Sequence, residues 1–428
     1  TYNYAPVNHF KRPTERYTLG GFAEYEMSDQ VTAYAEAGYA NNVTAGQIAE
    51  SGTFFAEEYQ FSLSDPRFTD AQRDYIVNNL VDADGNASGI DPTTGEFVAY
   101  IGKRNVEGGP RKDNLETEAV RFVGGFKGDI TQDGRFGFDA SVLYASTESS
   151  SFYENDFLLP SLATALDPAC ATDASCLTYD VFTYQGVTAE AAASIGGTAL
   201  LTGKTEQVVL NAFATGEVNN PLLTDSVING VLGFEVRKEG YSTTADTNYA
   251  EGLLLGQGGA TPSIKGSYEV AEVFAELLVP VMDTLEFELG GRLSNYSTTG
   301  TSSTYKIGAN WEMHEKAKLR ASYNRANRAP NVRELFTPTN EGLWSGTDPC
   351  AGTTPTYTAA QCALTGVTTA QYGNIGESPA SQYNGLFGGN ADLEQEEADT
   401  FSVGAIFRPL SGLVLTADYW NIQMDKLI

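Results

Sequence analysis

The residues best suited to metal chemistry lie in one acidic stretch. Asp82 and Asp84 stand in the run Asp-Ala-Asp-Gly-Asn, and Asp91 follows shortly after. Their carboxylates are oxygen ligands of the kind that Ca²⁺ prefers. The glycine comes early, however, and no glutamate closes the stretch as a calcium-binding loop requires. A simple Asp-Gly turn is therefore the favoured interpretation, with Ca²⁺ binding as the weaker alternative.

Groups for covalent catalysis are scarce. The chain has only two histidines, His9 and His314, and neither has the spacing of a Ser-His-Asp or Cys-His arrangement. The glycine pairs at 20–21, 124–125 and 290–291 lie inside strand-like segments, so they indicate bends or close contacts and not phosphate-binding loops. We therefore expect no enzymatic activity and no cofactor.

The four cysteines fall into two local pairs. Cys170 and Cys176 form one, Cys350 and Cys362 the other, and each pair closes a short stretch of chain. No Cys-x-x-Cys spacing occurs and both histidines are distant in sequence, so zinc is a poor alternative. Disulfide bonds Cys170–Cys176 and Cys350–Cys362 are predicted, and with them an oxidising compartment.

The charge balance excludes one class of partner. The chain carries 55 acidic and 26 basic residues, for a net charge of −29. A surface of this sign repels phosphate, so nucleic acid is not expected as a partner. Most of the acidic excess lies in four long segments between predicted strands, where it either keeps an exposed surface solvated or attracts cations and metal-bearing ligands.

These segments alternate with tight junctions along the whole chain. Twelve stretches predict strands, and no run of about 20 apolar residues predicts a spanning helix. The tight junctions are Ser28-Asp29, 131–134, 217–224, 280–283, His314-Glu315 and 409–411. The long gaps are 42–114, 149–203, 244–264 and 327–396. The short 297–300 turn is the exception on the long side. Such sorting is typical of a transmembrane β-barrel, with turns on one side and long loops on the other.

The predicted strands have two different faces. At 285–294, Leu285, Phe287, Leu289 and Leu293 share one face, and the polar residues share the other. Strands 119–130, 135–146, 226–238, 304–313, 318–324 and 412–420 repeat this alternation. A soluble sandwich would also alternate, but aromatic residues near the strand ends and mixed charges on the polar faces favour a barrel with a polar lumen.

Six charged residues are predicted to face this lumen. They either brace the barrel wall or form a polar path for a solute. They are Glu272, Glu276, Glu286, Glu288, Arg292 and Arg320.

Two motifs carry a resemblance to a known family. The run 324–335, Asn-Arg-Ala-Asn-Arg-Ala-Pro-Asn-Val-Arg-Glu-Leu, resembles a signature in the barrel of TonB-dependent outer-membrane receptors. The run 389–396, Gly-Asn-Ala-Asp-Leu-Glu-Gln-Glu, is similar to that family's Gly-Asn-Pro motif, although Ala391 and Gln395 replace its two prolines. Residues predicted to shape and anchor the loop between the motifs are Arg328, Pro330, Glu334, Asn390, Leu393 and Glu396. Direct ligand contact is the weaker alternative for the signature residues. Arg328 and Glu334 are expected to pair, and Pro330 to end the strand.

The resemblance implies an all-β, transmembrane antiparallel barrel with a plugged lumen. We expect residues 1–428 to be a portion of one such barrel domain, about twelve strands, with the plug and terminal strands elsewhere in a longer precursor. The implied function is TonB-energised uptake of a ferric siderophore, vitamin or carbohydrate across the Gram-negative outer membrane. Implied partners are outer-membrane lipid, the TonB–ExbB–ExbD complex and a small-molecule or metal-chelate ligand.

Ligand contacts are then expected in the long loops. The better candidates are large aromatic or basic side chains: Arg104, Arg111, Tyr59, Phe61, Tyr153 and Trp344. Two alternatives of other classes stay open. One is a passive porin-like channel, and the other is a structural or adhesive outer-membrane barrel.

Overall fold

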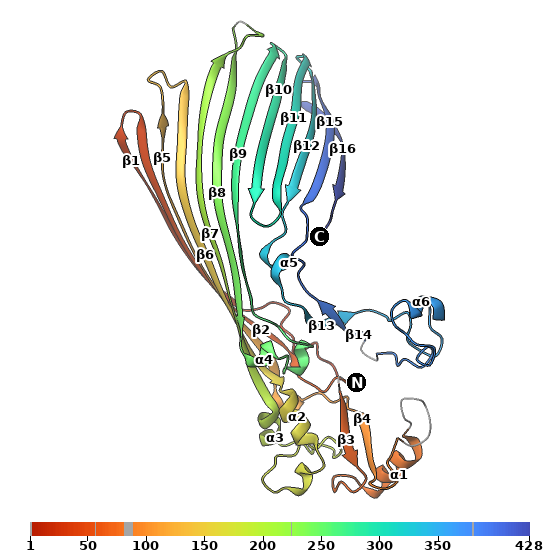
Figure 1. The fold of residues 1–428 in the computed structure, drawn as a ribbon. Helices are drawn as coiled ribbons and strands as arrows, with labels where there is room; N and C mark the ends of the chain where they lie inside the picture. Colours follow the sequence, from red (N-terminus) through yellow and green to blue (C-terminus); the bar gives the residue numbers. More distant parts are fainter. Residues whose placement is uncertain (1, 56, 81–88, 224, 379–380) are drawn as a thin grey trace.

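The computed structural model describes residues 2–55, 57–80, 89–223, 225–378 and 381–428. Its main feature is a curved twelve-stranded antiparallel sheet, in which each strand pairs with the next member of the sheet (Figure 1). In spatial order the strands are β1 (Thr14–Ser28), β2 (Val31–Glu50), β5 (Pro110–Asp129), β6 (Phe136–Phe157), β7 (Gly196–Asn219), β8 (Val227–Ala245), β9 (Ile264–Met282), β10 (Leu285–Tyr296), β11 (Gly300–His314), β12 (Ala317–Arg328), β15 (Glu396–Leu410) and β16 (Leu413–Asp425). The predicted number and type of strands are confirmed.

Connections at one end of the sheet are tight, and those at the other end are long, as predicted, with the short turn between β10 and β11 as the expected exception. The long gaps are shorter than expected, however, because several strands continue into them. β2 runs on to Glu50 and is paired with β5 as far as Pro110. β6 and β7 remain paired up to Phe157 and Gly196. The sheet therefore extends well beyond the 9–11 residues per strand that cross a bilayer, and its long end carries the loop structures.

Further elements lie at this long-loop end (Figure 1). They are the hairpin β3 (Glu58–Ser62) and β4 (Glu96–Tyr100), the hairpin β13 (Asn340–Ser345) and β14 (Gln382–Phe387), and helices α1 (Asp70–Asn79), α2 (Leu159–Leu166), α3 (Ala189–Ile195), α4 (Thr247–Ala250), α5 (Val332–Phe336) and α6 (Ala359–Ala363), with 3₁₀ turns η1 (Val106–Gly108), η2 (Cys170–Thr172) and η3 (Leu255–Gln257). No helix in the described residues is long and apolar enough to span a membrane.

One face of the sheet is apolar and exposed. Cross-strand register places Leu289, Ile307, Tyr323 and Phe401 in one row. Similar rows include Leu232, which is 68% exposed. An apolar face that is exposed in this way is typical of a membrane barrel, which turns such side chains toward lipid. We call it the outward face.

The opposite, lumen face carries charge, and all six predicted lumen residues lie on strands of this wall. Glu272 is buried, accepts a hydrogen bond from Ser294 Oγ at 2.6 Å and pairs with Arg292 at 2.7 Å. Glu288 pairs with Lys306. Arg320 forms a two-pronged pair with Asp418. In the described residues, no ion pair within 4 Å involves Glu276 or Glu286. Most of these charges therefore brace neighbouring strands.

Candidate functional site

The long loops fold into one assembly with its own core. The β3–β4 hairpin alternates, so that every second side chain turns inward onto α2, α3 and the segment after η2. Phe61 and Phe182 meet edge to face at 5.2 Å between ring centroids, and Phe157 meets Tyr179 at 5.6 Å. The gap between β2 and β5 thus packs against the gap between β6 and β7. Buried members of this core include Tyr59, Phe61, Phe68, Phe97, Phe157, Leu162, Leu166, Tyr179 and Ile195.

A buried polar network joins this assembly to the sheet. The Asp156 carboxylate accepts hydrogen bonds from Ser51 Oγ at 2.5 Å and from the Gly256 N–H at 3.1 Å. Arg111 lies on the next strand, where its Nε donates to the Ala49 carbonyl at 2.9 Å. Burial raises the pKa of Asp156, because a charged carboxylate is poorly solvated there. The network ties the ends of β2, β5 and β6 to the loop that carries η3.

Five of the six predicted ligand contacts lie within these packed regions. Tyr59 and Phe61 belong to the loop core, and Tyr153 is buried beside Arg111, whose Nη1 lies 3.4 Å from the Tyr153 hydroxyl. Arg104 donates to the Glu50 carbonyl at 2.7 Å and stacks on Phe54. Burial raises the pKa of Tyr59 to about 12, as expected for a phenol removed from water. Packing accounts for these side chains, and their direct contact with a ligand stays a prediction.

Trp344 has a different environment. It lies on β13, is 46% exposed and stacks against Tyr383 of β14 with 6.0 Å between ring centroids. The hairpin is held at its base, where Asn340 Nδ2 donates to the Ala260 carbonyl at 3.1 Å. Trp344 and Tyr383 therefore form an open aromatic surface on a supported hairpin, and of the six candidates Trp344 has the most accessible side chain.

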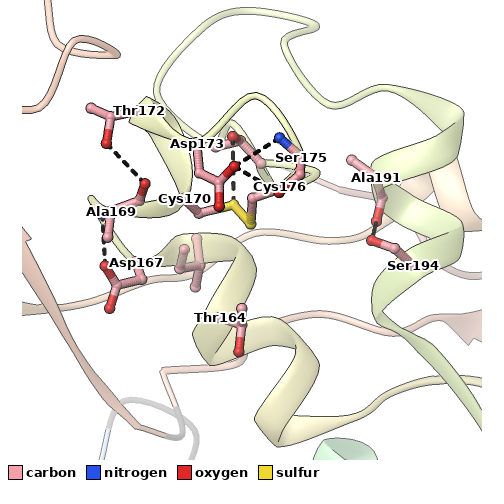
Figure 2. The surroundings of a disulfide bond; sticks show 12 residues. Thr164, Asp167, Ala169, Cys170, Thr172, Asp173, Ser175, Cys176, Ala191 and Ser194 are labelled. Carbon is pink, nitrogen blue, oxygen red and sulfur yellow. Dashed lines mark hydrogen bonds between the residues drawn. A yellow bond between two sulfur atoms is a disulfide. The ribbon is translucent and has the colours of Figure 1, made fainter.

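Both predicted disulfides are confirmed. Cys170–Cys176 closes the turn between α2 and α3, with 5.2 Å between its Cα atoms (Figure 2). Asp173 lies in the same turn and accepts from the Ser175 backbone N–H and hydroxyl (Figure 2). Cys350–Cys362 joins the segment after β13 to α6, with 5.8 Å between Cα atoms. Each bond stabilises a loop structure outside the main sheet.

The two family-like motifs meet at the base of the loop between β12 and β15. Arg328 Nε donates to Glu396 at 2.7 Å, and Arg328 Nη1 donates to Glu334 at 3.1 Å. Glu334 also accepts from the Asn331 backbone N–H, while Asn331 caps α5 by accepting from the Glu334 N–H. The expected pairing of Arg328 with Glu334 is present. We call this set of contacts, together with those of 389–390, the clasp.

Backbone hydrogen bonds complete the clasp. The Gly389 N–H donates to the Thr337 carbonyl and the Asn390 N–H to the Glu334 carbonyl, both at 2.8 Å. A Cβ atom at Gly389 would lie 2.8 Å from the Thr337 nitrogen, so only glycine fits this approach. The Asn390 side chain accepts from the Asp392 N–H, and the Leu393 N–H closes the same turn. Pro330 is buried just after the end of β12.

The contacts of the clasp stabilise the charged forms of Glu396 and Arg328. The hydrogen bond from Arg328 lowers the pKa of Glu396 to about 2. The same pairing raises the pKa of Arg328. At neutral pH the clasp therefore holds one cation between two carboxylates.

The acidic stretch is described only in part. Asp82 and Asp84 lie outside the described residues. Asp91 Oδ1 accepts hydrogen bonds from the backbone N–H groups of Thr93 and Thr94. These bonds lower the pKa of Asp91 and form the turn that leads into β4. The Ca²⁺ alternative stays untested.

Two features of the site had little signal in the sequence. Asp156 is one acidic residue among several in an acidic loop, and its partners Ser51 and Gly256 are each about a hundred residues away. Tyr383 lies nearly forty residues from Trp344 and meets it only because the intervening chain folds back. Helix α1 is capped by Thr69, which forms a reciprocal pair of hydrogen bonds with Gln72. Threonine serves here because its hydroxyl reaches the Gln72 N–H.

Comparison with known proteins gives a consistent result. A family model described as "TonB dependent receptor-like, beta-barrel" matches residues 55–428. The siderophore receptor PirA from Acinetobacter baumannii is 12% identical, with a TM-score of 0.50 over 97% of this chain and 43% of that one. The RagAB peptide importer in its open-open state is 12% identical, with a TM-score of 0.51 over 96% and 40%. A mutant of the ferric enterobactin receptor PfeA from Pseudomonas aeruginosa is 14% identical, with a TM-score of 0.47 over 98% and 44%.

No curated protein matches the chain. The chain spans less than half the length of these solved structures. At this level of identity the structural likeness concerns the fold, and PirA and RagAB support the same sheet architecture. The family match covers most of the chain and includes both motifs of the clasp. The chain belongs to the TonB-dependent receptor-like β-barrel family.

Proposed function

We propose that the chain is the barrel portion of an outer-membrane receptor that captures a scarce solute in its long loops and passes it through the barrel lumen. One observation carries the proposal: a folded loop assembly stands at one end of a family barrel sheet whose outward face is apolar and whose lumen face is charged. Loops with their own core and disulfides are suited to bind, because binding residues need a rigid support.

Uptake against a gradient requires energy. The family match supports an energy supply through TonB, which would act with ExbB and ExbD on a plug domain of the full-length protein. Outer-membrane lipid surrounds the outward face in this proposal. The ligand is a small molecule or metal chelate, and a ferric siderophore, a vitamin and a carbohydrate are the classes to test.

The exposed aromatic hairpin is the proposed first contact. Trp344 and Tyr383, whose rings are tilted by 43° to one another, offer an aromatic surface that suits the ring of a catecholate or a sugar. Contact with Tyr59, Phe61, Tyr153, Arg104 or Arg111 would require the loop assembly to open, since these side chains are packed or already bonded.

The test uses the full-length receptor and a ligand panel. Ferric catecholate, cobalamin, an oligosaccharide and a peptide are each titrated by calorimetry. We expect one class to bind, and Trp344→Ala to weaken that binding by about tenfold, since large aromatic side chains dominate binding energy. The control is Tyr184→Ala, which removes an even more exposed aromatic side chain elsewhere in the loops.

Two outcomes would contradict the proposal. Ion conductance through the purified protein without saturable binding would indicate a passive porin. Growth of a deletion strain like the parent's on every limiting nutrient, together with no binding, would indicate a structural or adhesive barrel.

A further inference from the structure

A polar groove of about 430 Å³ opens beside the long-loop end of β11 and β12. Its walls are the turn between β10 and β11, the end of β12 and the segment that leads into β15. Side chains that matter in it are Thr299, Thr301, Ser303, Asn327, Gln395 and Lys426. We propose that this groove binds the neutral sugar headgroup of a glycolipid in the surrounding membrane leaflet.

Strand register places the groove on the outward face. Tyr323 and Phe401 are in the apolar row, and along the same face Tyr305, Arg325 and Asp399 form the next row. Asn327 and Glu397 form the row beyond it. Because side chains two apart on a strand share a face, Asn327 points away from the lumen. The groove therefore lies outside the path that a transported solute would take.

A tyrosine pair marks the level of the groove relative to the membrane. Tyr305 and Tyr323 lie with 6.0 Å between their ring centroids, at the edge of the apolar rows that is nearer to the long loops. Tyrosines in this position form the belt where acyl chains give way to headgroups. Outward-facing residues directly beyond this belt therefore lie at the level of the lipid headgroups. Of this proposal's premises, only this placement in a membrane is shared with the proposed function.

Two side-chain amide oxygens in the groove lack hydrogen-bond partners among the described residues. Gln395 is 92% buried, and its Oε1 has no hydrogen-bond partner, although its Nε2 donates to Thr299 Oγ1 at 2.8 Å. Asn327 Oδ1 is also buried and unpartnered. Unsatisfied buried polar atoms cost free energy, so they indicate a missing partner. Gln395 stands where the family-like motif has a proline, whose side chain has no such acceptor.

The chemistry of the groove favours a polyol. Sugar hydroxyls donate and accept, so they can donate to Asn327 Oδ1 and Gln395 Oε1 and accept from the hydroxyls of Thr301 and Ser303. If the oxygen and nitrogen of the Gln395 amide were exchanged, the unpartnered group would be an N–H, and it could donate a hydrogen bond to a sugar oxygen. The partner is required in either orientation.

The charges disfavour a phosphate or a metal ion. Arg325 pairs with Asp399 at 2.6 Å, and Lys426 pairs with Glu394 at 2.8 Å and Glu397 at 3.1 Å. Three carboxylates thus face two cations, and a phosphate would be repelled. The Lys426 ammonium lies between the two glutamates, where a divalent cation would have to displace it. A neutral ligand meets neither obstacle.

The experiment measures lipid adducts on the full-length receptor by native mass spectrometry. The protein is kept in an amine-oxide detergent, because a maltoside would itself offer a sugar headgroup. The probes are a diglycosyl diacylglycerol, a phosphatidylglycerol with the same acyl chains, and CaCl₂ alone. We expect a glycolipid adduct that Gln395→Met and Asn327→Ala each weaken by about fivefold, the worth of one hydrogen bond.

Two further variants control for folding. Asn41→Ala removes an outward amide that is bonded to Glu116 on distant strands, and it should leave the adduct unchanged. Ser303→Ala keeps the backbone carbonyl that faces Asn327 and should weaken the adduct without disturbing the strand. The proposal is overturned if phosphatidylglycerol binds as tightly as the glycolipid, if Ca²⁺ binds and the variants abolish that binding, or if the groove variants behave like Asn41→Ala.

Discussion

The main sheet and the loop assembly use the same sequence pattern for opposite environments. In the β3–β4 hairpin, alternation buries Phe61, which is 1% exposed, against other loop segments. In β8, alternation leaves Leu232 68% exposed on the outward face. Period-2 hydrophobicity therefore identifies a strand with two faces, but it does not say whether lipid or protein covers the apolar one. Four experiments, ordered by expected effect, test this difference.

Truncation of a large side chain should show the difference between the loop core and the outward face of the sheet most clearly. We expect Phe61→Ala to destabilise the loop assembly by about 3–5 kcal/mol, because a cavity forms where the protein is close-packed. Hydrogen exchange of residues 58–80 and 89–100 should rise sharply, while the heat-modifiable migration of the barrel stays unchanged. The matched change Phe234→Ala on the outward face should have a much smaller effect, since lipid fills the space. Equal effects would contradict the assignment of the two environments.

An inserted charge tests the outward face directly. Leu232→Arg should cost about 2–4 kcal/mol for insertion into a bilayer, because a charged side chain is poorly solvated by lipid. Thr215→Arg is the control, since it lies on the lumen face in the row of Glu276. Folding yield in lipid vesicles measures both. Similar yields for the two variants would mean that the outward face does not meet lipid.

Reduction of the disulfides should affect the loops alone. Each bond closes a short loop, so removing it should cost the loop structures about 2–3 kcal/mol by the chain-entropy estimate. Dithiothreitol should increase proteolysis within 160–195 and 346–378 and leave the strands protected. Cys350→Ser with Cys362→Ser isolates the second bond. Loss of the barrel on reduction would indicate that loops and sheet fold as one unit.

The clasp should give the smallest effect, and it depends on pH. Because the pKa of Glu396 is lowered to about 2, its stabilisation is complete above the ordinary glutamate range and is lost as pH falls from about 4.5 toward 2. Arg328→Met removes the cation, so Glu396 should then protonate at a higher pH. Exchange of the Asn390 amide, followed against pH, measures the shift. An unchanged profile in the variant would refute the role of Arg328.

Local pattern was enough for the strands, and for pairs close in sequence. Alternation around Leu289 and turn residues such as Gly134 predicted the sheet, and the spacing of Cys170 and Cys176 predicted their bond. Long-range contacts were beyond this reasoning. The approach of Asp156 to Ser51 depends on how two loops dock, and no local pattern encodes that. Sequence reasoning could not show that most of the aromatic and basic residues selected as ligand contacts also pack within the loops. Their contact with a ligand stays a prediction.

The clasp also bears on which sequence changes this barrel can tolerate in evolution. Hydrogen bonds from Gly389 and Asn390 close the loop at its base, next to the ends of β12 and β15. Insertions, deletions or replacement of residues 338–388 should leave strand register unaffected, since these hydrogen bonds already join the two ends of that segment. We therefore expect this segment to be exchangeable together with its base. Grafting it onto a related barrel would test whether it carries the ligand preference that the proposed function assigns to the loops.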